Sequence, residues 1–483
     1  PMGDSVLIAM GNPSAWQNVI FTDDPIAGTW RGAASLMPLV PVHDPALFVD
    51  DDGRVYLYRG SSNVHPIWGA EIDPNHYFLP PGDSGGNREL IRLNASEQGW
   101  ERFGENHEDT LTAGYLEGAW LTKHNGIYYL QYAAPGTEWN VYADGVYTST
   151  HPLGPFTYEE YSPVSYKPAG FIRGAGHGSM VRDPWGNAWR FVTMVQGIVF
   201  NFERRIGMFP SGFDADGQLY VNTAYGDYPH YLPSAEPRGR EDWFTGWMLL
   251  SFEKPVTASS FQEGFGPPRA VDEEIKTYWL AETNASGEWL TVDLGEASEV
   301  SAIQVNYVDH ESNVYGKPDG LYHQYLIESS DDGEDWTVMV DKRENLEDVP
   351  NDYIELGEPR LTRYVRFTSY HVPTPNLAIS GLRVFGRGSG EPPAEVENFR
   401  VTRDVDRRVA HLTWDAVPGA QGAHLYYGIR SDKLYNSVMV YKDAAYQLNG
   451  LNVAPDYFFS IEAFNENGIS RRSGVIAAEM ALP

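Results

Sequence analysis

The chain has 483 residues, a length that predicts roughly three domains at about 150 residues each. Its net charge of −31 would repel a nucleic-acid backbone or an anionic membrane surface, so neither is an expected partner. The charge is interpreted as an aid to solubility or, alternatively, as an acidic cleft for a cationic ligand. The absence of cysteine excludes disulfides and thiol catalysis, but it does not decide the compartment. No apolar run reaches 18 residues, so no membrane span is expected, and no signal peptide is visible.

Residues 1–240 are predicted to form short strands separated by turns. The 48 glycines and 33 prolines indicate many turns, and no long helical periodicity is present. The expected strands are rich in β-branched and aromatic residues and occupy 55–60, 126–133, 144–149, 187–195 and 217–223. This pattern predicts an all-β fold.

A small unit recurs within this region. A turn of the Asp-Gly or Asn-Gly type leads into an aromatic-rich strand, and a later strand ends near a loop such as DDPIAGTW (23–30) or HPLGPF (151–156). Such repetition is typical of a β-propeller, with a repeated sandwich hairpin as the alternative.

Three segments each carry one ionisable residue just before an expected strand. They are HDPALFVDDDGRVYLYRG (43–60), LEGAWLTKHNGIYYLQYA (116–133) and GAGHGSMVRDPWGNAW (174–189). Their ionisable residues are Asp44, Glu117 and His177. In a propeller the innermost strands begin near the central axis, so these side chains are expected to converge on one pocket.

The three segments resemble blades two, three and four of glycoside hydrolase family 43. The resemblance implies a five-bladed β-propeller in which Glu117 is the general acid and Asp44 is the carboxylate that orients it and raises its pKa. It also implies that His177 lies at the axis and contacts a calcium or other hydrated ion directly or through water. A hydrogen-bonded core histidine is the alternative for His177.

The family's chemistry needs two carboxyl groups. One protonates the leaving oxygen while the other activates water on the opposite face of the sugar, about 6.5–9.5 Å away in inverting enzymes. In the family the base is an Asp of blade one, and here its segment is expected upstream of Pro1. Asp4, Asp23 and Asp24 are the candidates present, and Asp23 and Asp24 fit a solvated turn better.

Five further residues of this region are candidates for substrate contact. Trp139, Tyr142 and Phe171 would stack on a sugar ring or else pack in the core, and His43 would contact substrate or a neighbouring loop. Arg205 would face the pocket or form a surface ion pair. Because adjacent strand residues face opposite sides, at most one of Arg204 and Arg205 reaches the pocket.

Residues 249–387 and 394–483 form two further units, separated by the Gly/Ser/Pro/Glu-rich linker 386–395. The segments AVDEEIKTYW (270–279), WLTVDLG (289–295) and RYVRF (363–367) resemble the discoidin-like β-sandwich, or F5/8 C-terminal fold, of carbohydrate-binding module family 32. By that resemblance Asp272 and Thr277 are expected calcium ligands. The last unit resembles a fibronectin type III β-sandwich, with Trp414 in the core and Tyr457 at the corner position.

These resemblances imply an exo-acting, inverting glycosidase that removes terminal α-L-arabinofuranosyl, β-D-xylosyl or β-D-galactofuranosyl units from a polysaccharide or oligosaccharide. A monomer, secreted or held in the periplasm or at the cell surface of a bacterium, is expected. Two alternatives stay open: a glycan-binding propeller that lacks the general base, and a scaffold whose sandwiches bind other proteins.

Overall fold

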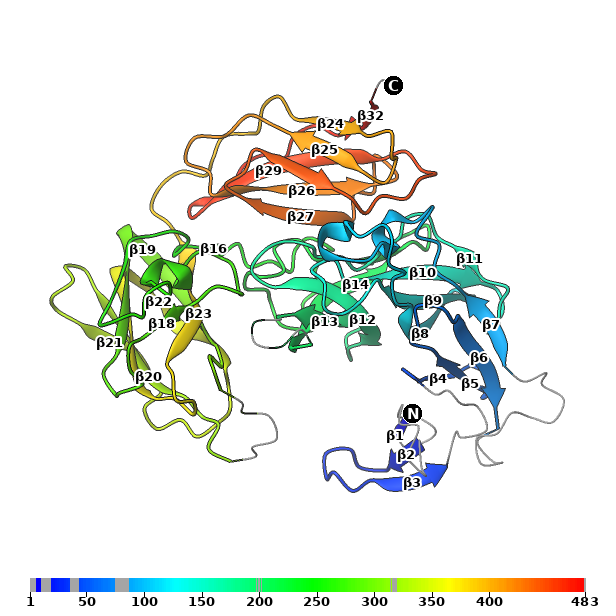
Figure 1. Cartoon of the computed structure of the whole chain (residues 1–483), viewed down its shortest axis with the longest axis horizontal. Helices are drawn as coiled ribbons and strands as arrows, with labels where there is room; N and C mark the ends of the chain where they lie inside the picture. Colours follow the sequence, from blue (N-terminus) through cyan, green and yellow to red (C-terminus); the bar gives the residue numbers. More distant parts are fainter. Residues whose placement is uncertain are drawn as a thin grey trace.

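The structure is a computed structural model of the chain, and it describes residues 6–9, 19–34, 43–73, 87–196, 198, 200, 202–312, 314 and 319–481. Its regular structure is almost entirely β, which confirms the all-β prediction (Figure 1). Among the described residues, no helix is long and apolar enough to cross a membrane.

The first region contains antiparallel sheets in which each strand pairs with the next along the chain, the arrangement of propeller blades. One sheet has three strands, β1 (Val6–Ala9), β2 (Val19–Thr22) and β3 (Arg31–Ala34). Three sheets have four strands each: β4 (Ala46–Val49), β5 (Val55–Arg59), β6 (Ile67–Ile72) and β7 (Arg88–Ile91); β8 (Glu117–His124), β9 (Ile127–Ala134), β10 (Ala143–Ser149) and β11 (Thr157–Tyr158); β12 (Arg173–Arg182), β13 (Ala188–Val195), β14 (Arg204–Phe213) and β15 (Leu219–Val221).

The first strands of the four-stranded sheets lie next to one another, with β4 against β8 and β8 against β12. This is the placement that the propeller prediction requires for the ionisable residues. Two 3-10 turns, η2 (Gly99–Glu101) and η3 (Glu105–His107), lie between β7 and β8 in sequence. The residues that the structure describes contain no fifth sheet in this region, so the five-bladed count stays a prediction.

The second region is an eight-stranded antiparallel assembly. Its first paired strand begins at Met248, one residue before the expected boundary. It comprises β16 (Met248–Leu249), β17 (Val256–Ala258), η4 (Pro267–Ala270), β18 (Trp279–Leu280), β19 (Trp289–Tyr307), β20 (Gln324–Ser330), β21 (Thr337–Asp341), β22 (Asn351–His371) and β23 (Ala378–Arg387). Its apolar core lies around Trp279, Leu290 and Phe367.

The third region is a two-sheet sandwich. One sheet holds β24 (Arg400–Arg403), β25 (Ala410–Thr413), β28 (Ala445–Leu448) and β32 (Glu479–Met480); the other holds β26 (Gly422–Gly428), β27 (Asn436–Tyr441), β29 (Phe458–Asn465), β30 (Gly468–Ile469) and β31 (Ile476–Ala477). Trp414 is buried in this region, and the hydroxyl of Tyr457 accepts a hydrogen bond from the backbone N–H of Asn452 at 2.9 Å.

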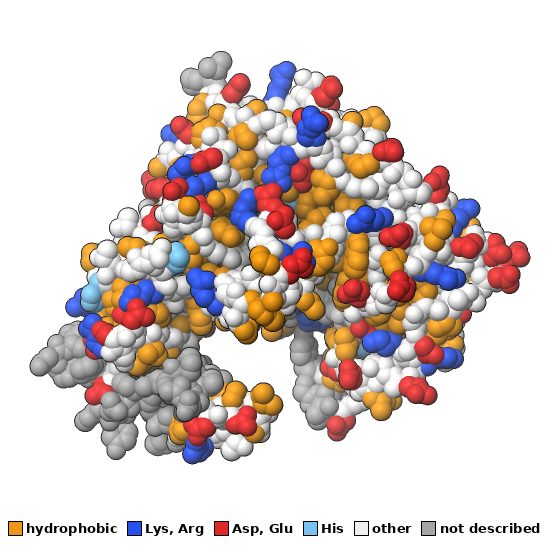
Figure 2. Space-filling view, turned by 180° about the vertical axis from the view of Figure 1, so that it is seen from behind, with side chains coloured by type: hydrophobic (Ala, Val, Ile, Leu, Met, Phe, Trp, Pro, Cys, Tyr) orange, Lys and Arg blue, Asp and Glu red, His pale blue; other side chains and the backbone are white. Residues whose placement is uncertain are grey.

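The sandwich packs directly on the propeller sheets (Figure 1). The backbone N–H of Gly99, in η2, donates to the carbonyl of Leu451 at 3.1 Å. The indole of Trp100 donates to the hydroxyl of Tyr158, which donates in turn to Asn452. Figure 2 shows acidic and basic side chains interspersed on the face turned to the viewer, so the negative charge is not gathered into one patch there.

Glu101 is a fully buried carboxyl beside this contact. It accepts hydrogen bonds from the hydroxyl of Tyr132 and from the backbone N–H of Asn94. Burial raises the pKa of Glu101 to about 8. Because the folded state keeps this proton while the unfolded state loses it near pH 4.5, Glu101 favours folding fully below pH 4.5, and that contribution is lost as the pH rises to about 8.

We therefore expect Glu101→Gln to flatten the pH dependence of stability. Relative to the variant, the wild type should lose about 1.4 kcal/mol of unfolding free energy per pH unit between pH 4.5 and about 8. Denaturant unfolding at several pH values measures this difference. The exposed Glu97→Gln is the control, and parallel curves for wild type and Glu101→Gln would contradict the prediction.

Candidate active site

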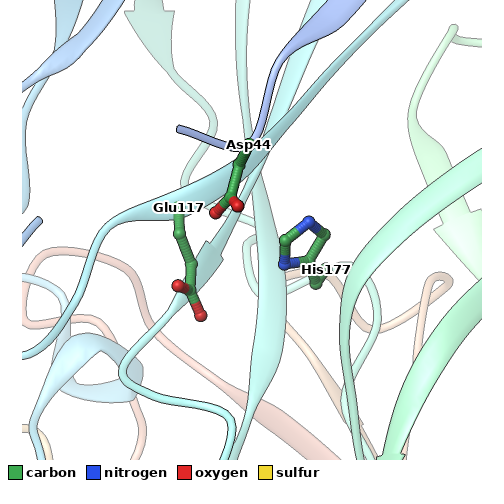
Figure 3. A group of neighbouring side chains, drawn as sticks. All are labelled: Asp44, Glu117 and His177. Carbon is green, nitrogen blue, oxygen red and sulfur yellow. The ribbon is translucent and has the colours of Figure 1, made fainter. Parts of the chain in front are cut away.

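Three consecutive sheets each bring one predicted residue to the same place (Figure 3). Asp44 lies two residues before β4, Glu117 is the first residue of β8, and His177 lies within β12. One side-chain oxygen or nitrogen of each lies within 4.8 Å of the others. The convergence predicted from the sequence is therefore present in the structure.

The backbone reaches this geometry through unusual conformations. Asp44 and His177 have positive φ angles of 45° and 51°, in the left-handed region that few non-glycine residues adopt. The pairing of β12 with β13 is irregular on both sides of Gly176, which turns His177 out of the regular strand alternation. Strained backbone of this kind is concentrated at functional sites.

Two glycines allow the sheets to approach closely here. A Cβ atom at Gly118 would lie 2.8 Å from the ring of His177, and one at Gly176 would lie 2.7 Å from the ring of Tyr142. The glycines of the EG and GAGHG motifs are thus required by the contact between neighbouring sheets.

Both oxygens of Glu117 accept a hydrogen bond. The hydroxyl of Tyr142 donates to Oε1 at 2.5 Å, and the hydroxyl of Ser61 donates to Oε2 at 3.0 Å. Burial, together with the negative charge of Glu117, raises the pKa of Tyr142 well above its usual value, so its hydroxyl keeps its proton. Tyr142 also lies 3.3 Å from Nδ1 of His177.

Tyr142 thus belongs to the site, but its ring is not a surface on which a sugar could stack. Its side chain is fully buried, and it acts through its hydroxyl. Ser61 was missed, because a serine after a strand carries no signal that distinguishes it from a turn residue.

A buried ion pair fixes the segment that follows His177. Asp144 and Arg190 have fully buried side chains, and Nη2 of Arg190 lies 2.5 Å from Oδ2 of Asp144. The same oxygen accepts the backbone N–H of Gly178 at 3.1 Å. Burial raises the pKa of Asp144, and Arg190 partly opposes that rise. Neither residue carries a sequence pattern that predicts this pairing.

The other predicted contact residues have their partners elsewhere. His43 is exposed, and its carbonyl accepts the N–H of Gly60. Trp139 packs edge-to-face on Phe103 with ring centroids 5.2 Å apart.

Phe171 and Arg205 lie at the contact with the second region, where both line one cavity. Phe171 is 3% exposed, with the guanidinium of Arg383 4.4 Å from its ring centroid, so its role is the packing alternative. Arg205 forms an ion pair with Glu203 at 3.6 Å, and Arg204 donates to the hydroxyl of Thr137 at 3.4 Å.

The candidate bases have structural roles or lie outside the described residues. Asp23 pairs with Arg31 at 2.5 Å, and Asp24 accepts the backbone N–H groups of Ile26 and Ala27 in the exposed turn between β2 and β3. These contacts are the solvated turn roles that the sequence favoured for both residues. Asp4 lies outside the described residues.

The two predicted calcium ligands of the second region contact each other. The hydroxyl of Thr277 donates to Oδ2 of Asp272 at 2.5 Å, and Oδ1 of Asp272 accepts the N–H of Glu274 at 3.0 Å. Burial raises the pKa of Asp272.

The chain matches two family models: glycosyl hydrolases family 43 over residues 8–219 and F5/8 type C domain over residues 255–379. It is 32% identical over 146 residues to "Xylosidase/arabinosidase 43A" of Humicola insolens, covering 24% of this chain and 40% of that protein. It is 30% identical over 158 residues to "Xylosidase/arabinosidase" of Bacteroides ovatus, covering 28% and 42%. It is 31% identical over 172 residues to "Arabinoxylan arabinofuranohydrolase" of Paenibacillus polymyxa, covering 32% and 25%.

The chain thus spans less than half the length of these relatives. A solved structure described as a thermostable family-43 glycoside hydrolase is 22% identical, with a TM-score of 0.34, and the match covers 46% of this chain and 68% of that one. The two family matches coincide with the propeller sheets and with the second region. The chain therefore contains a family 43 glycosyl hydrolase domain followed by an F5/8 type C domain.

Proposed function

We propose that the protein is an exo-acting, inverting glycosidase that hydrolyses terminal α-L-arabinofuranosyl, β-D-xylosyl or β-D-galactofuranosyl units of polysaccharides. The observation that carries this proposal is the convergence of Asp44, Glu117 and His177 from three sheets. The printed names of the relatives, which include xylosidase/arabinosidase, arabinofuranohydrolase and galactofuranosidase, support the substrate class.

Glu117 is the general acid of this proposal. It protonates the oxygen of the departing sugar while the bond to the anomeric carbon breaks. Tyr142 and Ser61 hold its carboxyl group in one orientation. Because carboxyl orientation decides whether the proton points at the leaving oxygen, these two hydroxyls serve catalysis through Glu117.

Asp44 is the supporting carboxylate and not the base. One carboxylate oxygen of Asp44 lies within 4.8 Å of one of Glu117. This separation is too short for the water molecule that an inverting enzyme holds between its acid and its base. The base of the proposal is a carboxylate outside this trio. If no such group acts, the site is that of a glycan-binding protein, and the first experiment below separates these functions.

We also propose calcium as the bound ion. Calcium takes six to eight oxygen ligands. The trio fits it poorly, because both oxygens of Glu117 already accept hydrogen bonds and His177 offers nitrogen. His177 would therefore contact the ion's water shell, whereas Asp272 and Thr277 supply the oxygen ligands that calcium prefers.

The finer architecture belongs to the same proposal. A five-bladed propeller accounts for the blade-like sheets, and a fibronectin type III sandwich for the third region, where the bond from Asn452 to Tyr457 is that of a tyrosine corner. We propose a monomer that works outside the cytoplasm of a bacterium, since its substrate is a polysaccharide.

Glu117→Gln should abolish hydrolysis of natural glycans while sparing activated substrates. Loss of a general acid costs about 10²–10⁴-fold in rate, and a nitrophenolate leaving group needs little protonation. Rates on aryl arabinofuranoside, xyloside and galactofuranoside, compared with rates on arabinoxylan, measure the effect. The exposed Glu108→Gln should behave like the wild type.

Full activity of Glu117→Gln on the polysaccharide would show that the acid is assigned wrongly. Binding of the glycan by the wild-type protein without any hydrolysis would favour the binding function instead.

Calcium added to protein treated with EDTA should raise the melting temperature. An ion that binds only the folded state, at a free concentration about 100 times its Kd, adds about 2.7 kcal/mol to the free energy of unfolding. Thermal unfolding with and without calcium tests this, and Asp272→Asn should lose most of the rise while the exposed Asp331→Asn keeps it. An equal melting temperature with and without calcium in the wild type would contradict the proposal.

A further inference from the structure

The segment that leads into the His177 strand is a closed loop. It runs from Lys167 to Gly174, and the N–H of Gly174 donates to the carbonyl of Lys167 at 2.9 Å. The irregular part of β12 that carries His177 begins at Gly174 itself. The position of this loop therefore bears directly on the position of the imidazole.

Asp227, in the segment after β15, holds this loop from within. Its carboxylate accepts the backbone N–H of Phe171 at 2.9 Å and that of Ile172 at 3.4 Å, and Nζ of Lys167 at 2.6 Å. Lys167 and Asp227 have side chains 6% and 1% exposed. A Cβ at Gly170 would lie 2.2 Å from the carboxylate, so the loop closes around Asp227 without spare room.

The F5/8 type C domain supports Asp227 from the other side. Arg383, on β23, donates from Nη1 to the carbonyl of Asp227 at 2.8 Å. Its Nε and Nη2 each bond one oxygen of Glu273 at 2.8 Å, and Nη1 also bonds Gln304 at 2.8 Å. The same guanidinium covers the ring of Phe171.

These contacts form one continuous connection from the F5/8 type C domain to the candidate active site. Arg383 is 2% exposed and reaches across the contact between two domains. A planar guanidinium bound to four oxygens has one permitted orientation, so it transmits a fixed position to Asp227.

We propose that Arg383 is a positioning residue for His177, acting through Asp227 and the 167–174 loop. The F5/8 type C domain is then part of the scaffold of the site, in addition to any glycan that it binds. The catalytic consequence of this inference rests on the proposed function, whereas its structural consequence does not.

The experiment uses the whole chain labelled with ¹⁵N-histidine, in which the His177 ring signals are identified by their loss in His177→Asn. Arg383→Met is compared with Arg363→Met, a matched control. Arg363 lies in the same domain and binds both oxygens of Asp293 at 2.8 Å, the geometry that Arg383 has with Glu273.

We expect the His177 signals to shift or broaden in Arg383→Met and to match the wild type in Arg363→Met. On an aryl glycoside, kcat should fall about 10–100-fold in Arg383→Met with KM changed less than twofold, because a misplaced site group lowers the rate more than the affinity. If the wild type hydrolyses nothing, the proposed function fails, and the His177 signals still test the inference.

Unchanged His177 signals in Arg383→Met, or equal changes in both variants, would overturn the inference. If Arg383→Met does not fold, Arg383→Lys replaces it. This variant keeps the charge facing Glu273, but a single ammonium cannot hold Glu273, Gln304 and the Asp227 carbonyl in one geometry. It should shift the His177 signals relative to the wild type, and the absence of any shift overturns the inference.

Discussion

The contact between β8 and β12 constrains the whole candidate site, because the backbone of one strand faces the imidazole of the other with no room for a methyl group. Gly118 has a φ of +61°, and a side chain there would overlap His177. Gly176 leaves the same narrow space for Tyr142. Any larger residue at either position would push the sheets apart and separate Glu117 from His177, so the spacing of the reactive groups is set by glycine.

Buried charges keep this close contact in register. Asp144 and Arg190 join the third and fourth sheets, and Asp144 also accepts the N–H of the residue after His177. Removing such charges from water costs several kcal/mol per ion, so the pair is weak evidence for stability. Its value here is geometric: it permits one arrangement of β12 against β10, and the site depends on that arrangement.

The sequence predicted the strands because turn residues and aromatic-rich stretches mark each of them locally. It predicted the convergent trio because equivalent residues of neighbouring propeller blades meet near the axis, and because the EG and GAGHG motifs resemble those of glycoside hydrolase family 43. The roles of Tyr142, Ser61 and Asp144 depend on which atoms of different sheets come within 3 Å, and no local pattern records that distance. Phe171 illustrates the same limit, since it looks like a stacking platform until a second domain covers it with Arg383.

The hydrogen bonds around Glu117 also give its two carboxyl oxygens different surroundings. The Tyr142 hydroxyl has a single hydrogen, and it donates to Oε1 of Glu117 while lying 3.3 Å from Nδ1 of His177. Both contacts are satisfied when Nδ1 carries a proton and donates to the tyrosine oxygen. Oε1 is then occupied as an acceptor by a hydroxyl that has no second hydrogen. The Ser61 hydroxyl, which donates to Oε2 at 3.0 Å, can instead rotate to accept, so in the proposed mechanism Oε2 is the oxygen that can carry the proton.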